Sequence, residues 1–358
     1  YPSPRCVRVC PLFLSPAGGA GGMEARALDS SLGPSQGSTC HDGTVRSDLS
    51  SSLTSALEQN GRSLSEFRIE GKIGTGKFST VYAAWHLAAG QPVALKTVQV
   101  FEILDSKLRM DCIKEVNMLR ALEHDHIIKY LDSFVHENEL VIVLEWARGG
   151  DLGSLLKERQ RTGAAFSETE IWGMFTNICA ALSHMHERRI MHRDIKPSNM
   201  FISSEGIKVG DLGLSRYFSS RTAEAHSVVG TPYYMSPECI RGLPYDWSSD
   251  VWSLGCMLYE MITLRSPFYM EGLNYYTLGK KITSCEYPPL PDSVPTNLKL
   301  LVYSMLHVDP KFRPRLSVLY QAAMAGSRGA DLMAWTNGER IVVPGSGEGA
   351  EAGAPASG

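Results

Sequence analysis

The side chains best suited to chemistry in this chain lie close together between His192 and Asn199. Asp194 can accept a proton from a hydroxyl group, Lys196 can reach a phosphate, and Asn199 can bind a metal ion. An acid, a cation and an amide in one short stretch predict phosphoryl transfer. Because a single His-Arg-Asp also occurs by chance, the prediction requires the other parts of such a site in the right order along the chain.

A glycine-containing stretch from Ile73 to Val81 lies between two strand-like patterns. Glycine lets the backbone fold closely over phosphate groups, so that N–H groups point at them. Gly74 and Gly76 therefore indicate a phosphate-covering loop, with a plain hairpin turn as the alternative. Ser79 stands where a third glycine would complete G-x-G-x-x-G, and a strand follows in place of a helix, which argues against a dinucleotide-binding fold.

Lys96 lies in the middle of an apolar strand pattern that begins at Val93. A lysine in a strand usually faces solvent, but this one follows the glycine loop at a spacing that suits a cation bridging two phosphates. Such a lysine needs a carboxylate partner. Glu115 falls on an apolar stripe of a predicted helix over about 105–122, and a charge on such a face is rarely left unpaired. We therefore predict an ion pair between Lys96 and Glu115.

Asp211 follows two further strand-like patterns, 200–202 and 207–209. An aspartate after a strand is commonly a turn residue, but this one comes soon after Asn199. Together the two side chains supply the oxygen ligands that a nucleotide-bound Mg²⁺ requires. The segment from Asp211 to Glu238 is long for a loop, and loops of that length are usually functional or disordered.

The composition of the chain narrows the classes of protein to which it can belong. The chain has 358 residues, a formal net charge of −3, 43% hydrophobic residues and 20% charged residues, which is ordinary for a globular protein. The charge argues against nucleic acid as the main partner. No apolar run approaches a membrane span, so we expect no membrane insertion. The eight cysteines include no C-x-x-C, which favours reduced thiols in an intracellular compartment.

Four regions follow from the patterns along the chain. Residues 1–64 are rich in small and polar residues and are interpreted as a disordered arm, and residues 327–358 as a low-complexity tail. Between them, 65–148 alternates in strand fashion, and 149–326 is dominated by helical periodicity. The predicted fold class is therefore α+β, with a strand-rich part before a helix-rich part.

Two helices of the second part have clear signals. Ser167 and Glu170 have the spacing of a capping box, followed by apolar residues at helical intervals. The run from Val251 to Ile262 is apolar nearly all round, which predicts a helix buried in the core.

Together these motifs resemble the catalytic domain of the eukaryotic protein kinases, over about residues 67–324. The resemblance implies a bilobal fold, with an N-lobe at 65–148 and a C-lobe at 149–326. Lys196, two places after Asp194, is typical of serine/threonine kinases and not of tyrosine kinases.

Within the protein kinases, the chain resembles the NIMA-related family. The resemblance rests on Asp211-Leu212-Gly213, in which Leu212 stands where Phe is commoner, and on the stretch from Val229 to Glu238. The chain is most similar to the short sixth and seventh members of that family. The stretches that carry this likeness are 127–134, 225–231 and 287–291.

The resemblance implies a role for each candidate residue. Asp194 would be the catalytic base, Lys196 would steady the γ-phosphate, Lys96 with Glu115 would hold the other phosphates, and Asn199 and Asp211 would bind Mg²⁺. The residues that would contact ATP are Ile73, Gly74, Gly76, Lys77, Val81, Ala94, Lys96, Leu144 as gatekeeper, Glu145 and Ala147. Residues 145–147 would form the hinge, in which Trp146 departs from the smaller residue usual there. Residues 192–199 would form the catalytic loop, and Asp250, which would brace this loop, and the pair of Glu238 with Arg313 would be structural.

Regulation is also implied by the resemblance. A phosphate on Ser227, four residues before Thr231, would pair with Arg193 and order the loop. The alternative is that Ser227 is a solvated loop residue like Ser219, Ser220 and Thr222. Tyr130 would fold inward and block the inactive site, although plain packing explains a tyrosine near a strand equally well.

Two functions are therefore weighed. The first is an Mg²⁺- and ATP-dependent serine/threonine kinase that acts on protein substrates in mitotic spindle and centrosome control, in the cytoplasm and nucleus and at spindle poles or microtubules. Leu214 favours serine over threonine, and family members favour a bulky apolar residue three places before the target. The alternative is a kinase-fold scaffold that acts by binding a partner, such as a longer NIMA-related kinase. If the protein is an active kinase, that longer kinase would be its activator.

Overall fold

The computed structural model describes residues 63–76, 79–99, 116, 119–137, 139–211, 232–272, 274–330 and 332. The predicted N-terminal arm and low-complexity tail lie almost entirely outside these residues. So does most of the predicted helix over 105–122. The predicted boundaries of the four regions therefore stay predictions.

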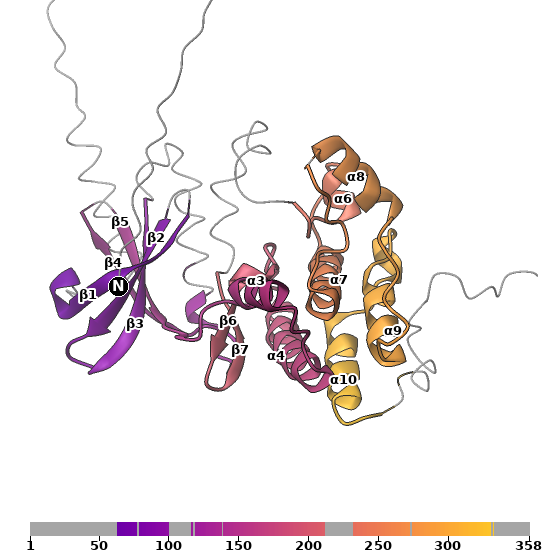
Figure 1. Cartoon of the computed structure of the whole chain (residues 1–358). Helices are drawn as coiled ribbons and strands as arrows, with labels where there is room; N and C mark the ends of the chain where they lie inside the picture. Colours follow the sequence, from indigo (N-terminus) through magenta and orange to yellow (C-terminus); the bar gives the residue numbers. More distant parts are fainter. Residues whose placement is uncertain are drawn as a thin grey trace, which may run out of the picture. The chain divides into compact units, whose positions relative to one another are not determined.

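The first described part is an antiparallel sheet of five strands in the order β1-β2-β3-β5-β4 (Figure 1). Apolar side chains alternate along these strands, and one face closes over a small core that contains Phe67, Leu95, Phe134 and Val143. The strands are β1 Phe67–Thr75, β2 Ser79–His86, β3 Gln91–Val98, β4 Tyr130–His136 and β5 Glu139–Glu145; the 3-10 helix η1 Leu64–Glu66 precedes them.

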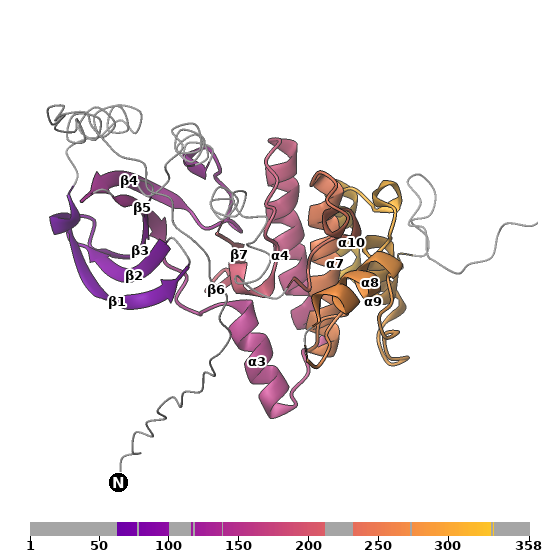
Figure 2. The ribbon, with the colours of Figure 1, turned by 90° about the horizontal axis from the view of Figure 1, so that it is seen from above.

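Helices dominate after β5, so the predicted α+β fold class is confirmed. Figure 2 shows the same order of parts from above, with α4, α7 and α10 next to one another. The helices are α3 Leu152–Thr162, α4 Glu168–Glu187, α6 Pro237–Ile240, α7 Trp247–Thr263, α8 Tyr275–Ser284, α9 Thr296–Met305 and α10 Leu316–Gly326, with the 3-10 helices η3 Pro197–Asn199 and η5 Pro310–Phe312.

Helix α4 begins where the sequence predicts. The Ser167 hydroxyl accepts a hydrogen bond from the Glu170 N–H at 3.2 Å, and the Glu170 carboxylate accepts one from the Ser167 N–H at 2.7 Å. Helix α7 starts four residues before the apolar run at Val251, because Asp246 caps it and polar residues fill its first turn.

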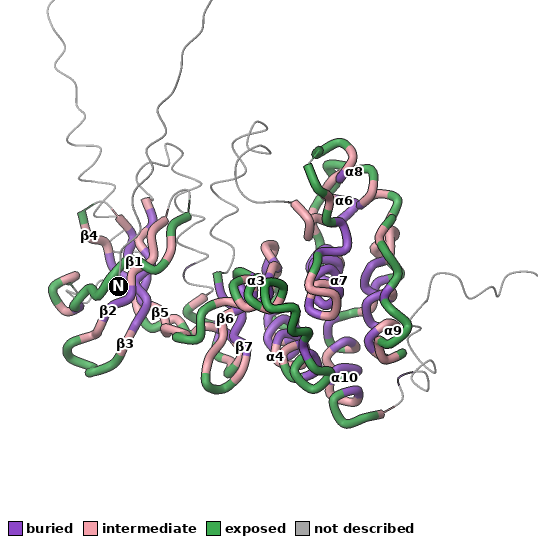
Figure 3. The backbone as a smooth tube through the Cα atoms, in the orientation of Figure 1, coloured by how far each residue is buried: buried purple, intermediate pink, exposed green. Residues whose placement is uncertain are grey.

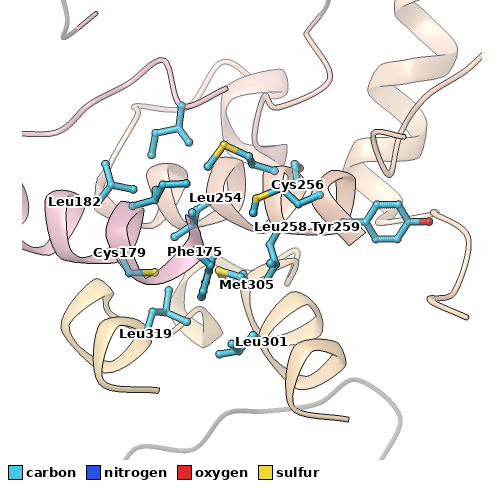
Figure 4. Close-up of a cluster of buried hydrophobic side chains, with 14 of the residues drawn as sticks. Phe175, Cys179, Leu182, Leu254, Cys256, Leu258, Tyr259, Leu301, Met305 and Leu319 are labelled. Atoms are coloured by element: carbon cyan, nitrogen blue, oxygen red, sulfur yellow. The ribbon is translucent and has the colours of Figure 1, made fainter. Parts of the chain in front are cut away.

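Helix α7 is the centre of the second core, and most of it is buried (Figure 3). Figure 4 shows side chains of α4, α7, α9 and α10 meeting there, among them Phe175, Leu254, Met305 and Leu319. Gly255 makes the close approach of α9 possible, since a Cβ on it would lie 2.8 Å from Met305 Cβ. Burying one large apolar side chain, such as Phe175 or Leu254, contributes about 2 kcal/mol. The packed helices therefore form a rigid base below the catalytic loop.

A short hairpin connects the catalytic loop to Asp211. Strands β6 Met200–Ser203 and β7 Gly206–Val209 pair antiparallel. The segment before β4 joins them, since the Val209 N–H donates to the His126 carbonyl at 2.8 Å and the Ile128 N–H donates to the Val209 carbonyl at 2.9 Å. The hairpin is thereby tied to the segment that leads into the N-terminal sheet.

Two expectations from composition also concern the described residues. The cysteines among them, Cys179, Cys239, Cys256 and Cys285, are all free thiols. Over the same residues, no helix combines the length and apolar character needed to cross a bilayer.

Candidate active site

Four residues predicted to contact ATP share one face of the N-terminal sheet. Val81 of β2 lies opposite Lys96 of β3, and Ala94 of β3 lies opposite Leu144 of β5. Side chains alternate along a strand, so Ala94 and Lys96 point to the same face, and their cross-strand neighbours point with them. The sheet register therefore places the two apolar candidates for the adenine pocket beside the lysine candidate for the phosphates.

The glycine loop closes at the end of this sheet. The Gly76 N–H donates to the Ser79 carbonyl at 2.7 Å. A Cβ on Gly76 would lie 2.8 Å from Ser79 Oγ, so the turn is tight on the side of Ser79. Gly74 and the exposed Ile73 lie at the end of β1. Lys77, also predicted to contact ATP, lies outside the described residues.

The catalytic loop brings three predicted residues together around one carboxylate. Lys196 Nζ lies 2.7 Å from Asp194 Oδ2, and Asn199 Nδ2 donates to the same oxygen at 3.0 Å. Asn199 Nδ2 also donates to the Asp194 backbone carbonyl at 2.7 Å. The Asp194 side chain keeps 30% of its surface exposed, so a substrate hydroxyl can still reach it.

Asp250 of α7 holds this loop from below, as expected. Its carboxylate accepts hydrogen bonds from the His192 N–H at 3.0 Å and from the Arg193 N–H at 2.9 Å. Burial alone would raise the pKa of Asp250, but hydrogen bonds from His186 and Tyr245 keep that pKa below its ordinary value. The backbone of Arg193 has a φ of 68°, a strained conformation for a residue other than glycine. A buried carboxylate thus fixes a strained turn.

Lys96 contacts the Asp211 carboxylate, and this ion pair differs from the predicted one. The predicted partner, Glu115, lies outside the described residues, so that pairing stays a prediction. Desolvation would raise the pKa of Asp211, but the ammonium group of Lys96, with Lys196 and His192 nearby, keeps it below its ordinary value. Asp211 is therefore ionised at neutral pH.

The donor set fits a magnesium ion. Both hydrogen bonds from the Asn199 amide to Asp194 use its nitrogen, and among the described residues its oxygen has no partner, so this oxygen can act as a ligand. Asp211 Oδ1 contacts Lys96, and the second carboxylate oxygen is turned to no partner among the described residues. Carboxylate and amide oxygens are the hard ligands that Mg²⁺ takes, usually with phosphate oxygens completing its shell.

A pocket opens behind the gatekeeper position. It is lined by Leu119, Ile128, Tyr130, Ile142, Leu144, Gly210 and the pair Lys96–Asp211. The Tyr130 hydroxyl donates to Ser133 Oγ at 2.7 Å, and burial raises the pKa of this phenol. Tyr130 therefore lies at the pocket wall with its hydroxyl bonded within its own strand, and the predicted blocking role stays a prediction.

The structure also contains the expected ion pair of the large lobe. Arg313 donates to the two carboxylate oxygens of Glu238 at 2.7 and 2.9 Å, and Ser249 Oγ donates to the same carboxylate at 2.7 Å. Burial alone would raise the pKa of Glu238, but the hydrogen bonds from Arg313 and Ser249 lower it to about 2. Since Glu238 lies in the first turn of α6, this pair fixes the end of the segment that leads from Asp211.

Three further residues were not predicted from the sequence. His186 and Tyr245 complete the hydrogen bonds of Asp250, and Lys208 of β7 forms an ion pair with Glu145 at the hinge. No spacing in the sequence points to the first two. A lysine within an apolar strand, the signal that identified Lys96, was present at Lys208 as well. The predicted regulatory residues Ser227 and Thr231 lie outside the described residues.

The site combines three features: a sheet face suited to a nucleotide, an Asp194 whose loop is held by Asp250, and the Asp211 carboxylate as a metal ligand. Together they define a phosphoryl-transfer site of the protein kinase type. A family model described as the protein kinase domain matches residues 67–324. The chain belongs to the protein kinase family. A protein kinase domain implies ATP binding and protein substrates.

The curated relatives are NIMA-related serine/threonine kinases, which confirms the predicted family. The chain is 41% identical over 250 residues to the probable serine/threonine-protein kinase nek3 of Dictyostelium discoideum, across 68% of this chain and 22% of that protein. It is 37% identical over 262 residues to the probable serine/threonine-protein kinase nek2 of the same organism, across 72% of this chain and 62% of that protein.

A human relative, serine/threonine-protein kinase Nek5, is 37% identical over 247 residues, across 68% of this chain and 34% of its own length. The chain thus spans between about a fifth and three fifths of the lengths of these relatives. The shared part is the kinase domain. The likeness to the short sixth and seventh members stays a prediction.

Proposed function

We propose that this protein transfers the γ-phosphate of ATP to serine and threonine hydroxyls of protein substrates. The observation that carries the proposal is the cluster in which Lys196 and Asn199 both contact the carboxylate of Asp194. Asp194 accepts the proton of the attacking hydroxyl, and Lys196 balances the charge of the transferred phosphate. The buried Asp250 keeps both in place through the loop backbone.

The other half of the site binds ATP. The sheet face with Val81, Ala94 and Leu144 covers the base, and Lys96 contacts the phosphates. Asp211 and the amide oxygen of Asn199 would hold Mg²⁺, which supplies charge neutralisation between the phosphates when bound. Asp211 is suited to this because its pKa lies below the ordinary value, so it carries a full charge at neutral pH.

A transfer assay tests this proposal. Wild-type protein is incubated with radiolabelled ATP, Mg²⁺ and three peptides that differ only in a serine, threonine or tyrosine acceptor. We expect label on the serine and threonine peptides, more on serine, and none without Mg²⁺. The Asp211→Asn variant should lose transfer while it remains folded. Equal transfer to tyrosine, or full activity with excess chelator, would overturn the proposal.

We also propose that phosphorylation of Ser227 activates the protein through Arg193, with Thr231 in the same segment. Arg193 is supported as the receiver because its backbone is held by Asp250, and in the described part of the chain its guanidinium forms no ion pair. A cation on a fixed backbone suits a phosphate that carries about −1.5 to −2 charges.

The cellular role we propose is control of the mitotic spindle and centrosome, with the protein in the cytoplasm and nucleus and a longer NIMA-related kinase as its activator. The family resemblance supports this role. Imaging of the tagged chain through division, together with removal of the endogenous protein, tests it. Normal spindles after removal, with no signal at spindle poles, would contradict it.

A further inference from the structure

A buried lysine of β7 faces the hinge. Lys208 is only 6% exposed and lies between the buried residues Ile207 and Val209. A buried ammonium group is costly unless carboxylates pair with it. Lys208 Nζ lies 2.8 Å from Glu145 Oε1 and 3.1 Å from Glu205 Oε2. Its two partners differ, because the Glu145 side chain is 30% exposed and that of Glu205 is 66% exposed.

Glu145 is the last residue of β5 and the first of the hinge. Its second carboxylate oxygen, Oε2, accepts a hydrogen bond from the Lys129 N–H at 3.2 Å, and the Glu145 N–H donates to the Lys129 carbonyl at 2.9 Å. Each oxygen of the Glu145 carboxylate thus has a partner within the protein. The same carboxylate joins the hinge to β7.

Strand β7 leads directly to Asp211, the candidate Mg²⁺ ligand. Lys208 is three residues before Asp211, and Gly210 lies between Val209 and Asp211. Both the N–H and the carbonyl of Gly210 have hydrogen-bond partners. The Gly210 N–H donates to the Asn199 carbonyl at 3.0 Å, and the Gly210 carbonyl lies 3.1 Å from His192 Nε2. The pair Lys208–Glu145 therefore connects the end of β5, at the hinge, to the end of β7, which leads to Asp211.

The Lys208 ammonium group keeps its charge at neutral pH. Burial alone would lower the pKa of Lys208, but the hydrogen bonds to Glu145 and Glu205 raise it above the ordinary value. The contact with Glu145 therefore involves a charged ammonium group.

We propose that Lys208 is a positioning residue for ATP binding, which acts through Glu145 by fixing the hinge backbone at a set distance from Asp211. The proposal rests on the proposed kinase function, because the hinge matters only if ATP binds there. It assigns Lys208 no contact with ATP and no part in the transfer step. Loss of the link should weaken binding of ATP more than it slows transfer.

Steady-state kinetics of the full chain test this proposal with Lys208→Met, Lys208→Arg, Glu145→Gln and the double variant Lys208→Met/Glu145→Gln. We expect KM for ATP to rise about tenfold in Lys208→Met and in Glu145→Gln. The kcat and the KM for the peptide should stay within about twofold. The double variant should be no worse than either single one, because both remove the same link. Lys208→Arg, which keeps the charge, should recover most of the affinity.

Glu205→Gln is the matched control, since it removes the exposed partner of the same lysine and should leave KM for ATP unchanged. If Lys208→Met does not fold, Glu145→Gln carries the test, because its side chain keeps its shape and is partly exposed. An unchanged KM for ATP, additive effects in the double variant, or a rise in kcat would each overturn the positioning role. Phosphate transfer by the wild type in the same assay shows separately whether the proposed function stands.

Discussion

Two ion pairs of the helical part each combine a basic side chain with a carboxylate, but they serve different purposes. In the first, Arg313 and Glu238 share two hydrogen bonds, and their side chains are 0% and 7% exposed. The guanidinium lies over the Trp252 ring at 5.0 Å. In the second, Lys196 and Asp194 share one contact, and their side chains are 37% and 30% exposed.

The difference between the two clusters separates structure from chemistry. In the buried pair every strong donor and acceptor is used, so it holds chain segments together but offers nothing to a substrate. In the open pair the carboxylate and the ammonium reach solvent, and the neighbouring Asn199 keeps an unused amide oxygen. Of the two pairs, only the open one can therefore meet a substrate.

A large loss of activity should follow from a change at Lys96, on the side of the site that would bind ATP. Lys96→Met removes the cation beside Asp211, and we expect kcat/KM to fall by about 10²- to 10³-fold. The melting temperature should change by only a few degrees, because methionine fills a similar volume. Arg161→Gln, which breaks an exposed pair with Glu158 far from the site in sequence, is the control and should leave activity unchanged. Loss of folding in place of activity would contradict this assignment.

The closed pair should respond in the opposite way. Glu238→Gln leaves the Arg313 charge buried without its partner, and we expect about 3 kcal/mol less stability. That loss corresponds to a melting temperature lower by roughly 10 °C. Activity per folded molecule should change far less than in Lys96→Met. Thermal unfolding followed by circular dichroism measures the effect, and an unchanged melting temperature would remove the structural role.

The same pair predicts a pH dependence. Its partners lower the pKa of Glu238 from about 4.5 to about 2, so the folded state binds the proton less readily than the unfolded state. The stabilisation is therefore complete above about pH 4.5 and is lost as the pH falls towards 2. Urea unfolding of wild type and Glu238→Gln at pH 6 and pH 3 should show a gap in stability that narrows in acid. A constant gap would contradict the ion-pair explanation.

The smallest predicted effect concerns regulation. Ser227→Ala should lower the activity of protein isolated from dividing cells severalfold, because Arg193 would lose the phosphate that orders the segment before Glu238. Ser219→Ala, in the same segment, is the control and should keep wild-type activity. Arg193→Ala should abolish the difference between wild type and Ser227→Ala. Equal activity of the two serine variants would remove this role from Ser227.

The parts of the fold with local signals were predictable. The cap at Ser167, the strand around Lys96 and the buried run from Val251 each depend on residues within a few positions of one another. Helix α7 nonetheless began earlier than its apolar run, because two polar residues near its start, Ser249 and Asp250, are buried as well. Local hydrophobicity does not report burial of that kind.

Contacts across long sequence separations were not predictable from spacing. Asp250 was expected to brace the catalytic loop, but its other partners, His186 and Tyr245, were not. His186 lies at the end of α4 and meets Asp250 only because α4 and α7 pack together. The partner that Lys96 has among the described residues, Asp211, was likewise assigned to the metal alone. A carboxylate such as Asp211 can pair with a lysine or bind a metal ion, and the sequence alone does not distinguish these two roles.

Asp194 is the residue on which the proposed reaction depends most directly. The decisive measurement is the initial rate of γ-phosphate transfer from ATP to a serine peptide, for wild type and for Asp194→Asn at equal concentration and with matched melting temperatures. Loss of the base should lower the rate by about 10²- to 10⁴-fold without a change in KM for ATP. Equal rates in the two proteins would show that the open cluster does not perform the reaction, and would leave a role in partner binding.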